Sequence, residues 1–249
     1  MTQSPRSIII TGASSGIGKA LALVHAGPGV QLGLTGRNQD RLDEVAAEAV
    51  ALGASVSTAS IDVTDRDGIA AWIEEFDTAH GLDLIYANAG ISRHVNDLSE
   101  IDQLTREVFD TNITGLINSI HPAMEIMLKR GRGQIAIMAS LAGLITLKHA
   151  PAYCASKACV RSYGESLRMT LKGTGVQVST ICPGFVKSPL TDKNKFPMPF
   201  MMDSEKAANI IKRGLERNKA RIAFPWRLLA IVRSAGSLPA GLWDRIGGR

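Results

Sequence analysis

The sequence of 249 residues has few cysteines, few aromatic residues and no long apolar run. Its three cysteines, Cys154, Cys159 and Cys182, are too few and odd in number for a disulfide framework, which favours a reducing compartment. We expect them to be small packing residues. No stretch approaches the roughly 18 apolar residues of a membrane-spanning helix. The amino-terminal segment holds an apolar run of only three residues, which does not fit a signal peptide, so we expect a cytoplasmic protein.

The five histidines are not spaced as the ligands of a metal site usually are. We therefore expect no metal. The net charge of +5 is concentrated at the carboxyl end, where residues 204–249 contain ten basic and three acidic residues. We expect no nucleic-acid partner, since no recognition motif accompanies this charge. With 45% hydrophobic residues the chain can build a large core, which excludes a disordered protein.

What the sequence does contain is an alternation of short apolar runs with longer segments of helical period. Strands are expected at 7–11, 30–35, 55–61, 82–87, 134–139, 176–182 and 221–224. Helices are expected at 16–26, 40–52, 65–80, 101–129, 152–172 and 204–218. Because parallel neighbours need a crossover, this order predicts an α/β fold with a parallel sheet and helices on both faces. We expect one doubly wound domain at 1–224 and an apolar and basic helical tail at 225–249, which is not an independent domain.

A glycine-rich turn follows the first expected strand and opens the first expected helix. It reads Thr-Gly-Ala-Ser-Ser-Gly-Ile-Gly over positions 11–18. Glycines let the backbone approach a pyrophosphate, and the helix terminus offers free N–H groups and a positive dipole end. The spacing differs from the usual dinucleotide fingerprint, and a purely structural turn is the alternative. The strand–turn–helix setting favours dinucleotide binding by Gly12, Ser14, Ser15, Gly16, Ile17 and Gly18.

Further candidate binding residues stand where the second, third and fourth strands are expected to end, at the edge where such sheets bind ligands. They are Arg37, Asn38, Asp62, Val63, Asn88, Ala89 and Gly90. After the second strand, a carboxylate would hold the ribose 2′-hydroxyl of NAD, whereas an arginine accommodates a 2′-phosphate. Arg37 stands there without a carboxylate, which favours NADP(H). The alternative is that Arg37 is a solvated loop residue.

Ser140, Tyr153 and Lys157 form the candidate catalytic group. Tyr153 and Lys157 are four residues apart on an expected helix and therefore share a face. A nearby ammonium favours the phenolate and so lowers the pKa of a phenol, which is otherwise near ~10. Ser140 stands at the expected end of a strand, where its hydroxyl could polarise a substrate oxygen. A Tyr–Lys pair alone is usually an amphipathic surface pair, so the assignment depends on the glycine-rich turn and residues 88–90.

With these motifs the chain resembles the short-chain dehydrogenase/reductase family over roughly residues 6–224. The resemblance implies a Rossmann domain that transfers hydride between a nicotinamide cofactor, NADP(H) by Arg37, and a carbonyl or secondary alcohol of a small molecule. It makes Tyr153 the proton donor and Ser140 the group that binds the substrate oxygen. It makes Lys157 the group that lowers the pKa of Tyr153 and binds the nicotinamide ribose.

The resemblance also supplies positions that spacing alone does not single out. It implies that Asn112 supports the lysine through a water in the proton path, which completes the catalytic group. It implies that the motif after the sixth strand binds the cofactor through Pro183, Gly184, Val186 and Ser188. Ser15 stands where a second basic mark of NADP binding is often seen in the family, so this mark is absent.

Residues 185–203 are expected to form the lid over the substrate, as this region does in the family. Its large apolar residues are Phe185, Leu190, Phe196, Met198, Phe200, Met201 and Met202. Methionine suits adaptable apolar surfaces, and active-site lids are commonly loops. We hypothesise an apolar or lipid-like substrate, and a lid that merely packs on its own domain is the alternative. His94 follows the 88–90 turn, either as a solvated loop residue or in contact with substrate.

The tail at 225–249 has two apolar patches, at 226–232 and 238–246, mixed with arginines. Such a segment could cover the lid, bury the interface of the homo-oligomer that we expect, or make a peripheral contact with a membrane surface. A different class of function stays open, in which the chain is an NADP(H)-binding regulatory or scaffold protein whose basic tail recruits a membrane or partner. The complete serine, tyrosine and lysine set argues against it, since a pure sensor needs no proton donor.

Overall fold

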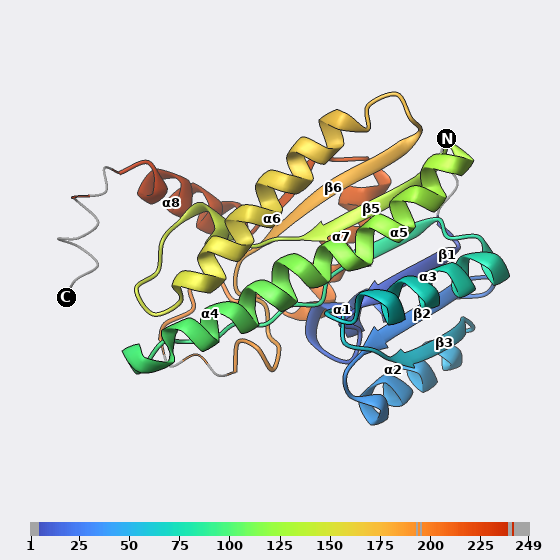
Figure 1. Ribbon diagram of the computed structural model, residues 1–249, viewed down its shortest axis with the longest axis horizontal. Coiled ribbons are helices and arrows are strands. Elements are labelled where there is room, and N and C mark those ends of the chain that lie inside the picture. The colour runs from blue at the N-terminus through green and yellow to red at the C-terminus, as the bar shows by residue number, and fades with distance from the viewer. Residues whose placement is uncertain (1–4, 193, 195, 239–240, 242–249) are drawn as a thin grey trace.

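The computed structural model describes residues 5–192, 194, 196–238 and 241 (Figure 1). In this part of the chain, seven strands form one sheet in the order β3-β2-β1-β4-β5-β6-β7, and every neighbouring pair is parallel. The strands are β1 (Ser7–Thr11), β2 (Gln31–Gly36), β3 (Ser55–Ser60), β4 (Leu84–Ala87), β5 (Gly133–Met138), β6 (Val176–Pro183) and β7 (Arg221–Phe224). The strand order reverses between β1 and β4, and ligands of open α/β sheets bind at such a switch point.

Helices cover both faces of the sheet, as the alternation of strands and helices predicts. They are α1 (Gly16–His25), α2 (Gln39–Ala51), α3 (Arg66–His80), α4 (Ile101–Phe109), α5 (Gly115–Arg130), α6 (Pro151–Thr170), α7 (Ser204–Glu216) and α8 (Trp226–Gly236). Two short 3-10 turns, η1 (Leu98–Glu100) and η3 (Leu141–Leu144), and a π-helical turn, η2 (Asp110–Thr114), complete the described elements. In Figure 1, α5 and α6 cross in front of the sheet, and α1 and α7 lie behind it. The α/β doubly wound fold is therefore confirmed.

Two apolar clusters, one on each face, hold the layers together. In β1, Ile8 and Ile10 belong to the cluster with α1, α2 and α7, whereas Ile9 belongs to the cluster with α3, α5, α6 and α8. All three are fully buried. A strand buried on both faces needs an uninterrupted apolar run. Burial of each such side chain stabilises the fold by roughly 1.5–3 kcal/mol. These strands give the strand ends, and the site built on them, a rigid base.

Side-chain caps explain where two of the helices begin. The side-chain oxygen of Asn38 accepts a hydrogen bond from the amide N–H of Arg41 at 2.9 Å, at the start of α2. Asp65 accepts one from the amide N–H of Gly68 at 3.1 Å, at the start of α3. Each cap satisfies a helix-terminal N–H that has no partner within the helix. Both helices therefore start directly after the strand ends where ligand binding is expected.

The structure differs from the predictions in several places. The helix predicted over 101–129 is interrupted at 110–114 by η2, because a π turn adds a residue that a 3.6-residue period cannot register. Turn η3, after Ser140, was not predicted, and it is too short to show periodicity. Cys159 is exposed, so the expectation that it packs in the interior is wrong, whereas Cys154 and Cys182 are buried.

The tail forms α8, which packs on the second cluster through Leu228 and Val232. Its other face carries Trp226 and Ile231, which are 72% and 55% exposed. Most of the second apolar patch predicted at 238–246 lies outside the described residues. Among the helices that are described, none combines the length and the apolar character needed to cross a membrane. The division at 224/225, the homo-oligomer and a membrane contact stay predictions.

Candidate active site

The glycine-rich turn between β1 and α1 lies against two other segments that were predicted to bind the cofactor. Gly12 has a φ of +65°, and a Cβ there would be 2.8 Å from Cα of Ala89. Gly16 has a φ of +54°, and a Cβ there would be 2.8 Å from Cβ of Ser188. A Cβ at Gly18 would lie 2.2 Å from the carbonyl oxygen of Gly12. Only glycine fits these three positions, and the turn brings together residues from β1, β4 and β6.

Asn88 holds this turn in place from the end of β4. Its side-chain amide donates hydrogen bonds to the carbonyl oxygens of Thr11 and Gly12, at 2.9 and 3.1 Å. The hydroxyl of Thr11 accepts hydrogen bonds from the amide N–H groups of Asn88 and Ala89, both at 3.0 Å. The amide of Asn88 therefore joins the two strands on either side of the switch point. A structural role for Asn88 follows from these contacts.

The amino terminus of α1 has the character of an anion site. Ser15 precedes the helix in an extended conformation and makes no side-chain cap, and the first turn contains no acidic residue. The leading N–H groups of α1 thus have no carboxylate that would compete for them. Ser14 lies at this turn beside Gly36 of β2, and Ile17 packs on the first cluster and orients the helix.

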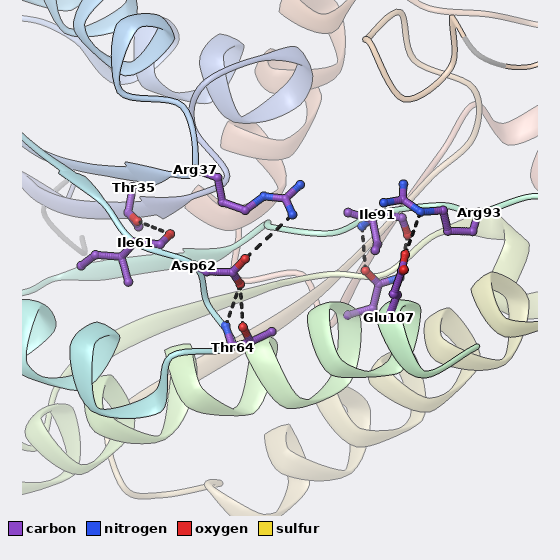
Figure 2. Close-up of polar contacts among 9 residues, drawn as sticks. Thr35, Arg37, Ile61, Asp62, Thr64, Ile91, Arg93 and Glu107 are labelled. Carbon is purple, nitrogen blue, oxygen red and sulfur yellow. Dashed lines mark hydrogen bonds and ion pairs between the residues drawn. The ribbon is translucent and has the colours of Figure 1, made fainter. Parts of the chain in front are cut away.

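The ends of β2 and β3 place an arginine and a carboxylate near each other. Nη1 of Arg37 is 3.8 Å from Oδ2 of Asp62, and the Arg37 side chain is 62% exposed. Asp62 accepts hydrogen bonds from the amide and the hydroxyl of Thr64, at 3.0 and 2.9 Å, which orient its carboxylate (Figure 2). Asn38 uses its side chain as the α2 cap, and the carbonyl of Val63 accepts from Asn118 at 3.0 Å. Arg37 is therefore an exposed cation with only a long contact to Asp62 at this edge of the sheet.

Asn112 lies in η2, the π turn, and is buried. Its side-chain amide makes three hydrogen bonds. Oδ1 accepts one from the N–H of Ile91 at 2.8 Å. Nδ2 donates one to the carbonyl of Ile91 at 2.9 Å and one to Oγ of Ser156 at 3.0 Å. A Cβ at Gly90 would be 3.1 Å from Oδ1 of Asn112 and 3.2 Å from Nζ of Lys157. Asn112 and Lys157 therefore meet over Gly90, and π turns are frequent at functional sites.

Ser140 lies at the start of η3, directly after β5. Its hydroxyl accepts a hydrogen bond from the amide of Ala142 at 3.1 Å and donates one to the carbonyl of Pro183 at 3.4 Å. Ser140 also lies near enough to Tyr153 to lower the pKa of its phenol. The carboxyl ends of β5 and β6 are thus connected through one hydroxyl. Two of the three predicted catalytic groups therefore lie near each other.

Tyr153 and Lys157 lie one turn apart on α6. Nζ of Lys157 is 5.8 Å from the centroid of the Tyr153 ring and donates a hydrogen bond to the carbonyl of Met138 at 2.9 Å. Burial raises the pKa of Tyr153, and the hydrogen bond from Ser140 opposes that rise. Burial also lowers the pKa of Lys157 to about 8. Ser140 lowers the phenol pKa in this structure, and the expectation that Lys157 also does so stays a prediction.

The segment after β6 runs from the site into the lid. The N–H of Gly184 donates to the carbonyl of Phe224 at 2.8 Å, and Val186 forms a short parallel bridge with Met202. The hydroxyl of Thr191 accepts from the N–H of Ser188 at 2.9 Å and donates to the carbonyl of Val186 at 2.9 Å. Thr191 was not predicted, because its role depends on a turn that brings it back to Ser188.

His94 contacts the lid across the entrance of the crevice. Its ring is 6.0 Å from that of Phe196, which is 6.0 Å from the ring of Phe185. A hydrogen bond of 3.0 Å joins Nε2 of His94 to Oδ1 of Asn194. Beside it, Arg93 pairs with Glu107 at 3.1 Å (Figure 2). His94 is half-buried in a loop, and both interpretations, a solvated loop residue or contact with substrate, stay predictions.

The residues at this strand edge fit a nicotinamide dinucleotide. Gly12, Gly16 and Gly18 have no room for a Cβ, which keeps the turn compact, and the first turn of α1 has neither a side-chain cap nor an acidic residue that would compete with an anion for its N–H groups. Nζ of Lys157 lies near Gly90, which follows β4, and Tyr153 lies one turn away on α6. The turn expected to bind the pyrophosphate and the group expected to transfer a proton thus both lie at the carboxyl ends of the strands.

Comparison with known proteins identifies the family. A family model described as short chain dehydrogenase matches residues 6–197. An uncharacterized oxidoreductase of Myxococcus xanthus is 41% identical over 242 residues, which are 97% of this chain and 96% of that protein. The chain belongs to the short-chain dehydrogenase/reductase family. Members of this family are oxidoreductases that transfer hydride with NAD(P) and act on small molecules.

Two further comparisons agree with this assignment. An uncharacterized oxidoreductase of Mycobacterium tuberculosis is 33% identical over 248 residues, which are 96% of each protein. A short chain dehydrogenase/reductase from Burkholderia phymatum, solved in complex with NAD, has a TM-score of 0.86 over 94% of each chain. At 24% identity, the latter shows the shared fold.

Proposed function

We propose that this member of the family is an NADP(H)-preferring enzyme that interconverts a carbonyl and a secondary alcohol on an apolar, lipid-like substrate. One observation carries the proposal: Nζ of Lys157 is 5.8 Å from the centroid of the Tyr153 ring, and Ser140 lies near enough to lower the pKa of the Tyr153 phenol. A phenol, a hydroxyl and a buried ammonium at the ends of parallel strands form a group for proton transfer.

The proposed cofactor residues are those at the strand ends. They are Gly12, Ser14, Ser15, Gly16, Ile17, Gly18, Arg37, Asn38, Asp62, Val63, Asn88, Ala89, Gly90, Tyr153, Lys157, Pro183, Gly184, Val186 and Ser188. When bound, the nicotinamide supplies hydride transfer to or from the reacting carbon. The polar contacts of Asn88 and Asn38 indicate that these two act mainly through the backbone they hold.

In the proposed mechanism, Tyr153 holds the proton that reaches the substrate oxygen. Because burial raises its pKa, the phenol is neutral near pH 7 and can donate during reduction. Ser140 donates a hydrogen bond to the same oxygen and stabilises the charge that develops there. With a pKa of about 8, Lys157 is mostly an ammonium near pH 7 and favours the phenolate left behind. Asn112 orients residues 90–91 beside Lys157, where a water would complete the proton path.

The preference for NADP(H) is proposed from Arg37. Its guanidinium is largely exposed and its contact with Asp62 is long, at 3.8 Å, so it is free to turn toward a 2′-phosphate. NAD is the competing cofactor, and the relative from Burkholderia phymatum is solved with it. An apolar substrate is proposed from the lid, where Phe196, Phe200 and Met201 are exposed. These side chains would be covered by a bound acyl or ring system.

The test is a screen of NADPH consumption with ketones and aldehydes of increasing chain length, for the wild type and Tyr153→Phe. General acid catalysis contributes about 10²–10⁴-fold, so the variant should lose at least that factor in kcat while it still binds NADPH. Tyr163→Phe is the matched control, because Tyr163 lies on the same helix and its hydroxyl bonds to His121 at 2.7 Å, away from Ser140.

Three outcomes would contradict the proposal. Near wild-type turnover of Tyr153→Phe would reject the proton donor. Activity confined to small polar carbonyls would reject the apolar substrate. NADPH binding without turnover of any carbonyl or alcohol, by an otherwise intact protein, would favour the regulatory or scaffold function instead.

A further inference from the structure

We propose that helix α8, which lies beyond the residues matched by the family model, positions the catalytic hydroxyl of Ser140, and that Leu228 is the positioning residue. The inference rests on the proposed function, because it requires that Ser140 act on the substrate oxygen. Residue 228 lies 88 positions from Ser140 in the sequence, but a short chain of contacts links them.

The first link is turn η3. The amide N–H of Gly143 donates to the carbonyl of Ser140 at 3.1 Å, and that of Ala142 donates to its hydroxyl at 3.1 Å. The same hydroxyl reaches the carbonyl of Pro183 at 3.4 Å. The direction of the Ser140 hydroxyl is therefore set by two backbone segments, η3 and the end of β6. A shift of either segment changes where the hydroxyl points.

The second link is the contact of α8 with both segments. A Cβ at Gly184 would lie 2.7 Å from Cδ2 of Leu228 and 3.5 Å from Cδ1 of Leu141, so these two leucines meet over Gly184. Leu228 and Leu141 are both buried in the second cluster. At the far end of α8, a Cβ at Gly236 would lie 2.2 Å from the carbonyl oxygen of Leu144. One helix thus touches η3 at both ends and β6 at its exit.

The contacts between α8 and η3 that position Ser140 are apolar and close, which makes them sensitive to the volume of one side chain. Removing most of the Leu228 side chain leaves space into which Leu141 and Gly184 can relax, because interiors are close-packed. A displacement of about 1 Å in a reacting group can reduce a rate on the order of 100-fold. The predicted effect is therefore catalytic, in addition to any loss of stability.

The experiment compares Leu228→Ala with Ile231→Ala, which removes the same kind of volume from the exposed face of the same helix. Leu228→Val is included in case the alanine variant folds poorly. We expect kcat to fall about 10- to 100-fold in Leu228→Ala and less in Leu228→Val. The Kd for NADPH should change less than kcat, because Gly184 is one of many proposed cofactor contacts. Ile231→Ala should retain wild-type kcat. Because the hydrogen bond from Ser140 opposes the rise in the Tyr153 pKa, the apparent pKa of kcat should also move upward in Leu228→Ala.

Hydrogen exchange of the cofactor-free proteins supplies a readout that does not depend on activity. The amides of Ala142 and Gly143 should exchange faster in Leu228→Ala, with α3 and α5 unchanged. Unaltered exchange in η3, or a wild-type kcat and pH profile in a folded Leu228 variant, would overturn the inference. Ser140→Ala distinguishes a failure of the proposed function from a failure of the proposed role of α8. If it leaves kcat unchanged, the proposed function fails, whereas a large loss in Ser140→Ala with none in the Leu228 variants rejects α8 alone.

Discussion

Replacing Lys157 by methionine should remove a specific pH dependence from the stability of the cofactor-free protein. Lys157 is 4% exposed, and burial lowers the pKa of its ammonium from 10.5 to about 8. One pKa unit corresponds to about 1.4 kcal/mol, so the buried charge opposes folding by about 3 kcal/mol where both states are protonated. The variant loses the hydrogen bond of the ammonium to the carbonyl of Met138 and its contact with the Tyr153 ring.

The direction of the effect follows from the sign of the shift. Between about pH 8 and about pH 10.5 the unfolded chain binds a proton at Lys157 that the folded chain does not bind. Stability therefore rises with pH in this window, and below it the full penalty is present. The difference in unfolding free energy, wild type minus Lys157→Met, should increase by about 2 kcal/mol from about pH 7.5 to about pH 9.5.

Urea unfolding at these two pH values measures this difference, because other titrating groups are common to both proteins and cancel. Loss of the hydrogen bond to Met138 changes the free energy of unfolding by a similar amount at both pH values. It therefore shifts one curve of unfolding free energy against pH relative to the other more than it changes the slope. Lys148→Met is the matched control, since Lys148 is exposed on the 145–150 loop, and its difference from the wild type should stay constant. Parallel curves for the wild type and Lys157→Met would refute the reasoning.

Two further predictions concern the cofactor site. Arg37→Ser should reduce the ratio of kcat/KM for NADPH over NADH by about 10- to 100-fold, since a charge-assisted hydrogen bond is worth about 1.5–3 kcal/mol, and an unchanged ratio would remove Arg37 from the site. Gly18→Ala should cost about 1–3 kcal/mol in urea unfolding and weaken NADPH binding, because its Cβ would lie 2.2 Å from the carbonyl oxygen of Gly12. Gly27→Ala is its control, as nothing lies within 4 Å of a Cβ there, and equal effects of the two substitutions would contradict the cradle.

Much of this architecture could be predicted because its signals are local and regular. The run at Ile8–Ile10 predicts a strand buried on both faces, and both clusters contain it. Asn88 could be placed beside the glycine-rich turn although it is 76 positions from Gly12, since parallel strands end at one edge. The signal in these cases is the alternation of short apolar runs with segments of helical period. Contacts between the elements then stabilise the strands and helices that this pattern predicts.

The features that could not be predicted depend on backbone and side-chain geometry that residue spacing does not reveal. The π turn at Asn112 adds one residue to a helix whose apolar period continues on both sides. Thr191 acquires a role only because a lid turn returns its hydroxyl to Ser188. The influence of Ser140 on the pKa of the Tyr153 phenol depends on distances and burial. No spacing rule in the sequence encodes these quantities.

The segment beyond β6 links the proposed lid to the proposed support of Ser140. Gly184 is in contact with Leu228 of α8 and Leu141 of η3, and the proposed lid begins immediately after it. If α8 positions Ser140 as proposed, a change in the lid or in α8 that makes room for another substrate also loosens the support of Ser140. Substitutions selected for a new substrate at these positions should change kcat together with KM, unless the volume around Gly184 is restored by a compensating side chain.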